Sequence, residues 1–306
     1  MTKPIVVCGP TASGKTSLAI ALAEIYNGEI VSADSMQIYR HMNIGTAKPT
    51  AEEQNRVVHH MIDVVDPGEV YSAARYSREA APIVNDIIGR NKTPIICGGT
   101  GLYINALISG VDFAKNGEDD GTRALLEKEF SELGGVKMLE KLAAIDSESA
   151  EKLHPNDRKR IIRALEVFYV TGKTISEHNR LSKLVAPRFD AIFIGITPKQ
   201  RQVLYDRINK RVDLMLKLGL EDEVRNLYEQ GILCETASQA IGYKEMLDYL
   251  NGNCSLTEAS ELIKQKSRNY AKRQLTWFKN DSRVNWVEYD VSEKLEDLCQ
   301  KATSFI

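Results

Sequence analysis

The stretch GPTASGKTS, residues 9–17, decides the fold of this chain. It fits the pattern GxxxxGK[S/T] of a phosphate-binding loop. The apolar run IVVC, residues 5–8, comes directly before it, and the run LAIALA, residues 18–23, comes directly after it. A buried strand, a glycine-rich loop and a helix in this order form the context that the motif requires. The stretch therefore predicts an anion-binding loop in an α/β domain.

The composition of the 306-residue chain is typical of a soluble globular protein. Its formal net charge of −2 excludes a general attraction to nucleic acid, so any such binding must come from local patches. The five cysteines are scattered without metal-type spacing, which favours free thiols in a reducing compartment. The first apolar run is too short for a signal peptide or a membrane span. We therefore expect a cytoplasmic protein that makes no membrane contact.

Strand-like and helix-like runs alternate in the first third of the chain. PIVVCG (4–9), EIVSAD (29–34) and TPIICGG (93–99) are typical of buried strands. TSLAIALAEIYN (16–27) and APIVNDIIGRN (81–91) are typical of helices. Short apolar strands separated by helices predict a doubly wound parallel sheet of the P-loop NTPase-like α/β class.

The character of the sequence changes between residues 113 and 184, where strand-like runs give way to charged helical segments. This change predicts a helical insertion, 113–184, in a catalytic core made of residues 1–112 and 185–306. Strands and long helices return after the insertion. They are expected at 189–197, 201–220, 256–280 and 284–289.

The phosphate loop offers several groups to an anion. Its backbone N–H groups from Thr11 to Thr16 would form a nest, backed by the N-terminus of the following helix. Lys15 would reach the terminal phosphates, and Thr16 would offer its hydroxyl to Mg²⁺. The alternative is a glycine-rich turn without a ligand. The candidate diphosphate ligands in the loop are Gly9, Pro10, Thr11, Ala12, Ser13, Gly14, Lys15 and Thr16.

The loop alone does not name the reaction, and two strand ends supply further candidates. Asp34 ends the run EIVSAD, where a kinase or ATPase often places an aspartate that organises Mg²⁺ and water. The alternative for Asp34 is a helix cap. Thr100 follows another strand in GGTGLY, and strand ends of such sheets face the ligand crevice. The alternative there is a tight turn that merely needs glycine.

Two basic clusters stand out in a chain that is otherwise nearly neutral. One lies at residues 264–279 and has aromatic residues among its lysines and arginines, and the other lies at 158–163. Basic side chains with interleaved aromatics suit a nucleic-acid backbone. The alternative is a solvated helix face whose aromatic residues pack in the core.

Taken together, eight segments resemble the tRNA dimethylallyltransferases, also called tRNA isopentenyltransferases, of the bacterial type. They occur in the family's order between about residues 5 and 278. The segments are GPTASGKTSLA, DSMQIYR, NIGTAKP, HHMID, CGGTGLYI, NDRKRIIRALEV, ASQAIGYKE and RNYAKRQLTWF. The resemblance implies transfer of a dimethylallyl group from dimethylallyl diphosphate to the exocyclic amine of adenosine 37, with release of pyrophosphate. The implied acceptors are tRNAs that read codons beginning with U.

The resemblance also implies roles for single residues. Asp34 matches the residue that accepts a hydrogen of the amine, and Thr100 matches a second catalytic residue that positions the reacting groups. Lys15 and Mg²⁺ would stabilise the charge on the leaving pyrophosphate. Arg207 and Arg211 are expected to close over the diphosphate from the opposite side. We expect a monomer.

The anticodon stem-loop of tRNA is the implied macromolecular partner, with the reacting adenine flipped out of its stack. The insertion would grip the stem-loop, and residues 34–37 would contact the flipped base. The implied RNA contacts are Asp34, Ser35, Met36, Gln37, Thr100, Arg123, Lys159, Arg160, Ile161, Ile162, Arg163, Gln239, Ala240, Ile241, Gly242, Tyr243 and Lys244.

Two other functions compete with this interpretation. A small-molecule kinase would place ATP in the same loop, but it leaves the basic insertion and the QAIGYK segment unexplained. A non-catalytic RNA-binding protein with a relic loop is the second alternative. The presence of Lys15, Thr16, Asp34 and Thr100 argues against it.

Overall fold

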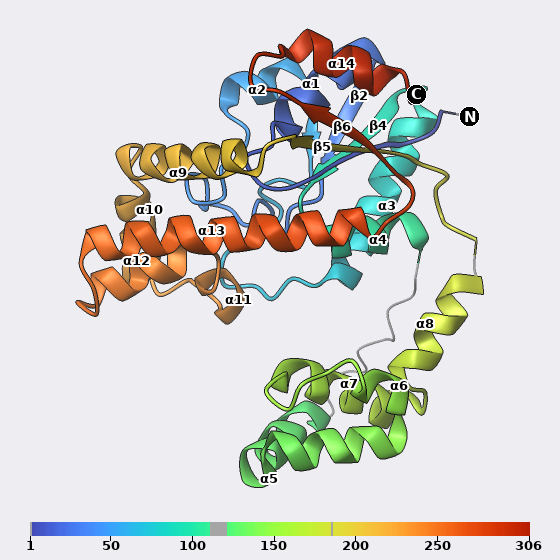
Figure 1. The fold of residues 1–306 in the computed structure, drawn as a ribbon, viewed down its shortest axis with the longest axis vertical. Coiled ribbons are helices and arrows are strands. Elements are labelled where there is room, and N and C mark those ends of the chain that lie inside the picture. The colour runs from blue at the N-terminus through green and yellow to red at the C-terminus, as the bar shows by residue number, and fades with distance from the viewer. Residues whose placement is uncertain (1, 111–120, 185) are drawn as a thin grey trace. The chain divides into compact units, whose positions relative to one another are not determined.

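The computed structural model describes residues 2–110, 121–184 and 186–306 (Figure 1). The chain forms two compact units, one made of residues 1–108 and 189–306 and the other of residues 109–188. The expected insertion, 113–184, lies inside the second unit. Its two expected boundaries fall at or beside residues 111–120 and 185, which lie outside the described residues.

A single six-stranded sheet forms the centre of the first unit, with the strand order β3-β2-β4-β1-β5-β6. Every pair of neighbouring strands is parallel, which confirms the predicted sheet type. The strands are β1 Ile5–Cys8, β2 Gly28–Ser32, β3 His59–His60, β4 Thr93–Gly98, β5 Ile192–Pro198 and β6 Val284–Tyr289. The sequence predicted all of them except β3, because two residues are too short to show a periodic pattern.

Helices cover both faces of this sheet, as expected of a doubly wound fold (Figure 1). Alternate residues of β1 enter opposite layers of the core: Ile5 and Val7 pack with α1 and α14, whereas Val6 and Cys8 pack with α3, α4, α9 and α13. The helices of this unit are α1 Lys15–Ile25, α2 Ala51–Arg56, α3 Ala73–Gly89, α4 Gly101–Ser109, α9 Arg201–Lys217, α10 Leu220–Glu229, α11 Glu235–Ser238, α12 Tyr243–Leu250, α13 Leu256–Lys279 and α14 Leu295–Thr303.

The second unit is helical, with a small apolar core of its own. Gly134 interrupts α5 with a backbone φ of 79°, and the neighbouring Gly135 lies against the backbone of Pro155. A side chain at residue 135 would clash there, since an added Cβ would lie 2.0 Å from the Pro155 carbonyl oxygen. Its helices are α5 Thr122–Ile145, α6 Ser147–Ala150, α7 Arg158–Thr171 and α8 Ile175–Leu184. Among the described residues, no helix has the length and hydropathy that a membrane span requires.

The carboxyl ends of β1, β2 and β4 lie at the same edge of the sheet, because the strands are parallel and in register. Cys8 of β1 is paired with Gly98 of β4, and Ser32 of β2 is paired with Cys97. The phosphate loop, Asp34 and Thr100 follow these three strand ends directly. The topology therefore brings the three separate sequence signals to one edge.

Candidate active site

The phosphate loop connects β1 to α1 in a conformation that glycine makes possible. Gly9 and Gly14 have positive φ angles of 143° and 95°. An added Cβ on Gly9 would lie 2.4 Å from the Ile196 carbonyl oxygen, so no larger residue fits there. The nest predicted from Thr11 to Thr16 is only partly open, because the N–H of Thr11 donates to Oε1 of Gln274 at 2.8 Å. The amide groups at the start of α1 have no partner within the helix.

Cationic side chains surround the open side of the loop. A cavity of about 430 Å³ there is lined by Lys15, Lys48, Arg207, Lys210 and Arg211, together with the hydroxyl residue Thr16. Lys15 donates to the Pro10 carbonyl oxygen at 2.6 Å, and burial lowers the pKa of Lys15 to about 8. Such an excess of positive charge in a partly desolvated cavity favours an anionic ligand.

Both predicted arginines point to the loop from α9, one helical turn apart. Arg207 donates to the Tyr289 hydroxyl at 2.7 Å, and that hydroxyl donates to the Ser13 carbonyl oxygen at 2.8 Å. Arg211 donates to Oγ1 of Thr11 at 3.3 Å, and burial lowers its pKa. One long hydrogen bond leaves most of the Arg211 guanidinium available to an anion. The buried Oγ of Ser13 also has no partner among the described residues.

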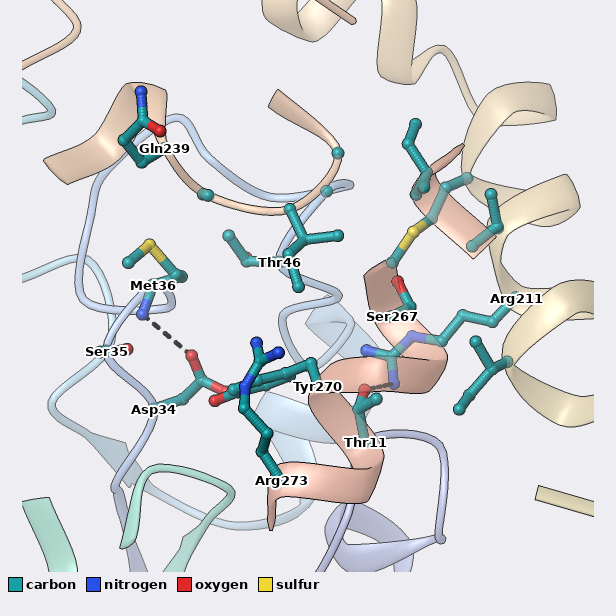
Figure 2. Close-up of a pocket in the computed structure, with 18 residues that line it drawn as sticks. Thr11, Asp34, Ser35, Met36, Thr46, Arg211, Gln239, Ser267, Tyr270 and Arg273 are labelled. Carbon is teal, nitrogen blue, oxygen red and sulfur yellow. Dashed lines mark hydrogen bonds between the residues drawn. The ribbon is translucent and has the colours of Figure 1, made fainter. Parts of the chain in front are cut away.

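Asp34 is held rigidly at the end of β2. Its Oδ1 accepts the N–H of Met36 at 2.9 Å and that of Gln37 at 3.4 Å, so one carboxylate oxygen caps the following turn. Figure 2 shows the Met36 contact and the ring of Tyr270 extending toward the carboxylate. Burial and the charge of Asp34 raise the pKa of Tyr270 to about 12, which keeps the phenol protonated. The capping alternative therefore holds for one oxygen of Asp34 and leaves the other for chemistry.

Thr100 contacts the same turn. Its Oγ1 accepts the N–H of Ser35 at 3.1 Å and donates to Oγ of Ser35 at 3.4 Å. The glycines on either side permit close packing, since an added Cβ on Gly99 would lie 2.1 Å from Nε2 of Gln274 and one on Gly101 would lie 2.1 Å from Nε1 of Trp277. The alternative of a tight turn that needs glycine is thus correct for the glycines. Thr100 itself holds Ser35 through hydrogen bonds.

A cavity of about 280 Å³ opens beside Asp34 (Figure 2). Its polar wall includes Thr11, Arg211, Gln239, Ser267, Tyr270 and Arg273, and its apolar wall includes Ile208, Val212, Met215, Ile241 and Ile263. The sequence interpretation did not assign Ser267, Tyr270 and Arg273 to this cavity. Their spacing of three residues on α13 puts them on one helix face, and that spacing was the available signal.

Only part of the QAIGYK segment lines this cavity. Gln239, Ala240, Ile241 and Gly242 line it. The side chain of Tyr243 is buried and its hydroxyl donates to Glu223. Packing has removed the Tyr243 side chain from solvent, and the RNA contact expected at this residue stays a prediction. Gln37 is also engaged within the protein, since its side-chain amide donates to the carbonyl oxygens of residues 46 and 47.

The residues of α7 for which RNA contacts were predicted differ in burial. Lys159 and Arg160 have exposed side chains at the start of α7. Ile161 and Ile162 are fully buried in the core of the insertion, so these residues expose no side chain to RNA, and the contacts expected of them stay predictions. Helical periodicity is the physical reason, because Ile161, Ile162 and Leu165 recur at spacings of three and four residues and lie on the buried face of α7.

Two further cations of the insertion share one carboxylate. Arg163 pairs with Glu166 at 2.9 Å, and Arg123 lies 3.6 Å from the same side chain. Both arginines retain substantial exposure, 35% and 49% of their side chains. They therefore remain accessible to a phosphate group.

Part of the basic cluster on α13 is engaged within the protein. Lys264 pairs with Asp213 at 2.8 Å, Arg268 donates to Asn209 at 2.6 Å, and Phe278 is buried. The alternative of an ordinary helix face therefore fits these residues. Lys244, at the end of the QAIGYK segment, donates to Oε1 of Gln239 at 3.1 Å.

The fold and the site together define a P-loop-like α/β protein in which a cationic cavity at the loop meets a second cavity beside a fixed carboxylate. The IPP transferase family matches residues 37–281. A tRNA dimethylallyltransferase of Acetivibrio thermocellus is 50% identical over 299 residues, 96% of this chain and 95% of that protein. A tRNA dimethylallyltransferase of Geobacter sulfurreducens is 48% identical, covering 94% of this chain and 92% of that protein.

Solved structures give the same result. The full-length tRNA isopentenylpyrophosphate transferase from Bacillus halodurans is 43% identical with a TM-score of 0.73, covering 99% of this chain and 96% of that one. A eukaryotic dimethylallyltransferase acting on tRNA is 31% identical with a TM-score of 0.83, covering 99% of this chain and 77% of that one. The chain belongs to the IPP transferase family.

Proposed function

We propose that the protein transfers a dimethylallyl group from dimethylallyl diphosphate to the exocyclic amine of adenosine 37 in tRNAs that read codons beginning with U. The observation that carries the proposal is the meeting of two cavities at Arg211, which lines both the cationic cavity at the loop and the cavity beside Asp34. A donor with its diphosphate in the first would present its allylic carbon to an amine in the second. Family membership does not favour the alternative of an ATP-dependent kinase.

The cationic cavity suits the leaving group. Breaking the bond between the allylic carbon and oxygen places negative charge on the departing pyrophosphate. Lys15, Arg207, Arg211 and the first amide groups of α1 lie around that position, where they would stabilise the charge.

Magnesium fits the oxygen ligands of the same cavity. The Thr16 hydroxyl lines it, and substrate phosphates commonly complete the coordination of Mg²⁺. The described residues contain no cluster of three or more His, Cys, Asp and Glu side chains that could hold a metal by themselves. Thr16 and the substrate phosphates would hold Mg²⁺, and the ion would supply positive charge that stabilises the leaving group.

The fixed carboxylate suits the acceptor. The exocyclic amine of adenine is a weak nucleophile because its lone pair is delocalised into the ring. Asp34 would accept a proton of this amine as the new carbon–nitrogen bond forms. Two backbone amide groups hold Oδ1 of Asp34, and Thr100 holds Ser35 next to it, so the base is oriented before the adenine arrives.

The RNA would be held through local charge. Lys159, Arg160, Arg163 and Arg123 place exposed cations on the insertion, and phosphate contacts of this kind need no positive net charge. Gln239 at the cavity and Met36 beside Asp34 would contact the flipped base. We propose that the enzyme acts as a monomer and meets tRNA in the cytoplasm.

A transfer assay tests the function. The protein is mixed with Mg²⁺, tRNA that carries adenosine 37 and radiolabelled dimethylallyl diphosphate. We expect label on adenosine 37 with the native protein and a loss of at least about a hundredfold with Lys15→Ala, the size of effect seen when a group that stabilises transition-state charge is removed. ATP consumption without label on the RNA would establish a kinase instead.

A further inference from the structure

Met215 lies in the wall between two cavities. The smaller cavity, about 280 Å³, is the one beside Asp34. The larger, about 640 Å³, lies between residues 43–55 and the end of α9. Arg211 and Met215 line both. Because Arg211 is charged and faces the phosphate loop, Met215 is the apolar side chain that the described walls of the two cavities share.

An apolar stripe on α9 leads to this wall. Ile208, Val212 and Met215 follow one another at helical spacing and line the smaller cavity. With a rise of 1.5 Å per residue, the stripe from Ile208 to Met215 is about 10 Å long. A donor whose diphosphate is bound by Arg211 would begin its hydrocarbon beside Ile208 and Val212. A hydrocarbon tail that starts there reaches Met215 last.

The larger cavity carries apolar side chains that the fold leaves in water. Leu214 and Leu218 are 54% and 62% exposed. They line this cavity together with Ala47 and Pro49. A second stretch of hydrocarbon lying along these side chains would remove apolar surface from water, which is favourable.

We propose that Met215 sets the length of the allylic donor by closing the smaller cavity after one five-carbon unit. This inference rests on the proposed function and adds the residue that selects the donor. Shortening the side chain would join the two cavities and admit geranyl diphosphate, a ten-carbon donor. The reaction itself would be unchanged: the carbon–oxygen bond breaks, the carbon–nitrogen bond forms, and pyrophosphate and one proton leave.

The test compares donors in variants at the wall. Native protein, Met215→Val, Met215→Ala and Leu218→Ala are assayed with tRNA and either dimethylallyl or geranyl diphosphate. The readout is the ratio of kcat/KM for the two donors. We expect the ratio to shift toward the geranyl donor by about tenfold or more in Met215→Ala, a change typical of an altered hydrophobic pocket, and by less in Met215→Val. Leu218→Ala enlarges the larger cavity but leaves Met215 between the two cavities, so this variant is expected to keep the native ratio.

The outcomes separate the two levels of inference. A native protein that transfers neither donor overturns the proposed function. A native protein that uses both donors equally, or a Met215→Ala variant that transfers the five-carbon unit with the native ratio, overturns the role of Met215. If Met215→Ala does not fold, the test uses Met215→Val. The inhibition constant of geranyl diphosphate against dimethylallyl transfer is then measured, and we expect geranyl diphosphate to inhibit this variant more tightly than the native protein.

Discussion

Lys15 shows how a single residue is tuned by its place in the loop. An exposed lysine is charged well above neutral pH, but burial lowers the pKa of Lys15 to about 8. The desolvated ammonium donates to the Pro10 carbonyl oxygen, and the charge of Asp34 also favours its protonated form. Part of the affinity for a diphosphate is therefore expected to come from restoring a partner to this charge.

This pKa predicts a pH dependence of ligand binding. Above about pH 8 the free protein loses the Lys15 proton and must regain it to pair with an anion. The affinity for pyrophosphate should therefore fall as pH rises through 8, by up to about tenfold per pH unit. Calorimetric titration between pH 7 and 9.5 measures the change. Lys210→Met removes another charge from the same cavity and should keep the break near pH 8, whereas Lys15→Met should remove it.

Glu29 illustrates a residue that acts on stability rather than on the site. Its buried carboxylate accepts hydrogen bonds from Arg90 and Lys92, both at 2.7 Å, and contacts His60 at 2.7 Å. The hydrogen bonds from Arg90, followed by those from Lys92 and His60, hold the pKa of Glu29 well below its ordinary value of 4.5. Glu29 lies near the start of β2, at the opposite end of that strand from Asp34.

Glu29→Gln should lower the free energy of unfolding at pH 7 by about 2 kcal/mol, a value reduced for the partly exposed partners. Because the folded pKa is depressed, the stabilisation is present above the unfolded pKa and is lost as pH falls below about 4.5 toward the folded value. Urea melts of the native and variant proteins should therefore begin to converge as pH falls below about 4.5 and continue to do so toward the depressed folded pKa. Glu24→Gln, at an exposed pair with Arg56, should leave stability nearly unchanged.

At the scale of elements, one side chain of α10 orders the loop that lines the cavities. The carboxylate of Glu223 accepts the N–H groups of Asn43 and Ile44 at 2.8 Å and that of Gly45 at 3.1 Å, as well as the Tyr243 hydroxyl. Gly45 allows this approach, since an added Cβ would lie 2.5 Å from the Tyr243 ring. The loop at residues 43–45 thus depends on a side chain about 180 residues away in the sequence.

Glu223→Ala should release this loop, because three amide groups and a phenol lose one charged acceptor. Hydrogen exchange of the amides at residues 43–45 should accelerate, and prenyl transfer should fall by about tenfold or more, equal to about 1.4 kcal/mol. Glu221→Ala, which breaks only an exposed pair with Arg225 on the same helix, is the matched control. Unchanged exchange at 43–45 in the Glu223 variant would contradict the proposed role.

At the scale of the whole molecule, the two units carry different charged groups. The first unit holds the cationic cavity and the fixed carboxylate, whereas the second unit offers exposed cations on α7 over a small core of its own. The net charge of −2 leaves long-range attraction of RNA weak, so binding must rely on these local groups.

Replacing Lys159 and Arg160 together by alanine should weaken tRNA binding across sequences. The slope of the logarithm of affinity against that of salt concentration should flatten by about 1.5–2, the loss of two phosphate contacts. Binding of pyrophosphate should not change. Fluorescence anisotropy with an anticodon stem-loop from 50 to 200 mM salt measures the slope. Lys152→Ala, an exposed cation of the same unit paired with Glu148, should keep the native slope.

Local sequence was sufficient for much of the fold. The runs around residues 5–8 and 93–98 are apolar and β-branched, and they formed the buried parallel strands that their composition predicts. The loop pattern at residues 9–17 predicted the loop that lines the cationic cavity, because its glycines and its lysine carry the information within nine residues. Features that depend on contacts between distant residues were not predicted. These are the two-residue strand β3 and the face of α13 that lines the cavity.

The sequence by itself therefore determined the sheet, the loop and the order of the elements, since hydrophobic periodicity and glycine placement act over a few residues. Only the tertiary structure decided which side chains are available for chemistry. It buried Tyr243, Ile161 and Ile162, tied the Thr11 amide to Gln274 and placed Tyr270 beside Asp34. Burial and long-range hydrogen bonds depend on which elements pack together, and no short stretch of sequence contains that information.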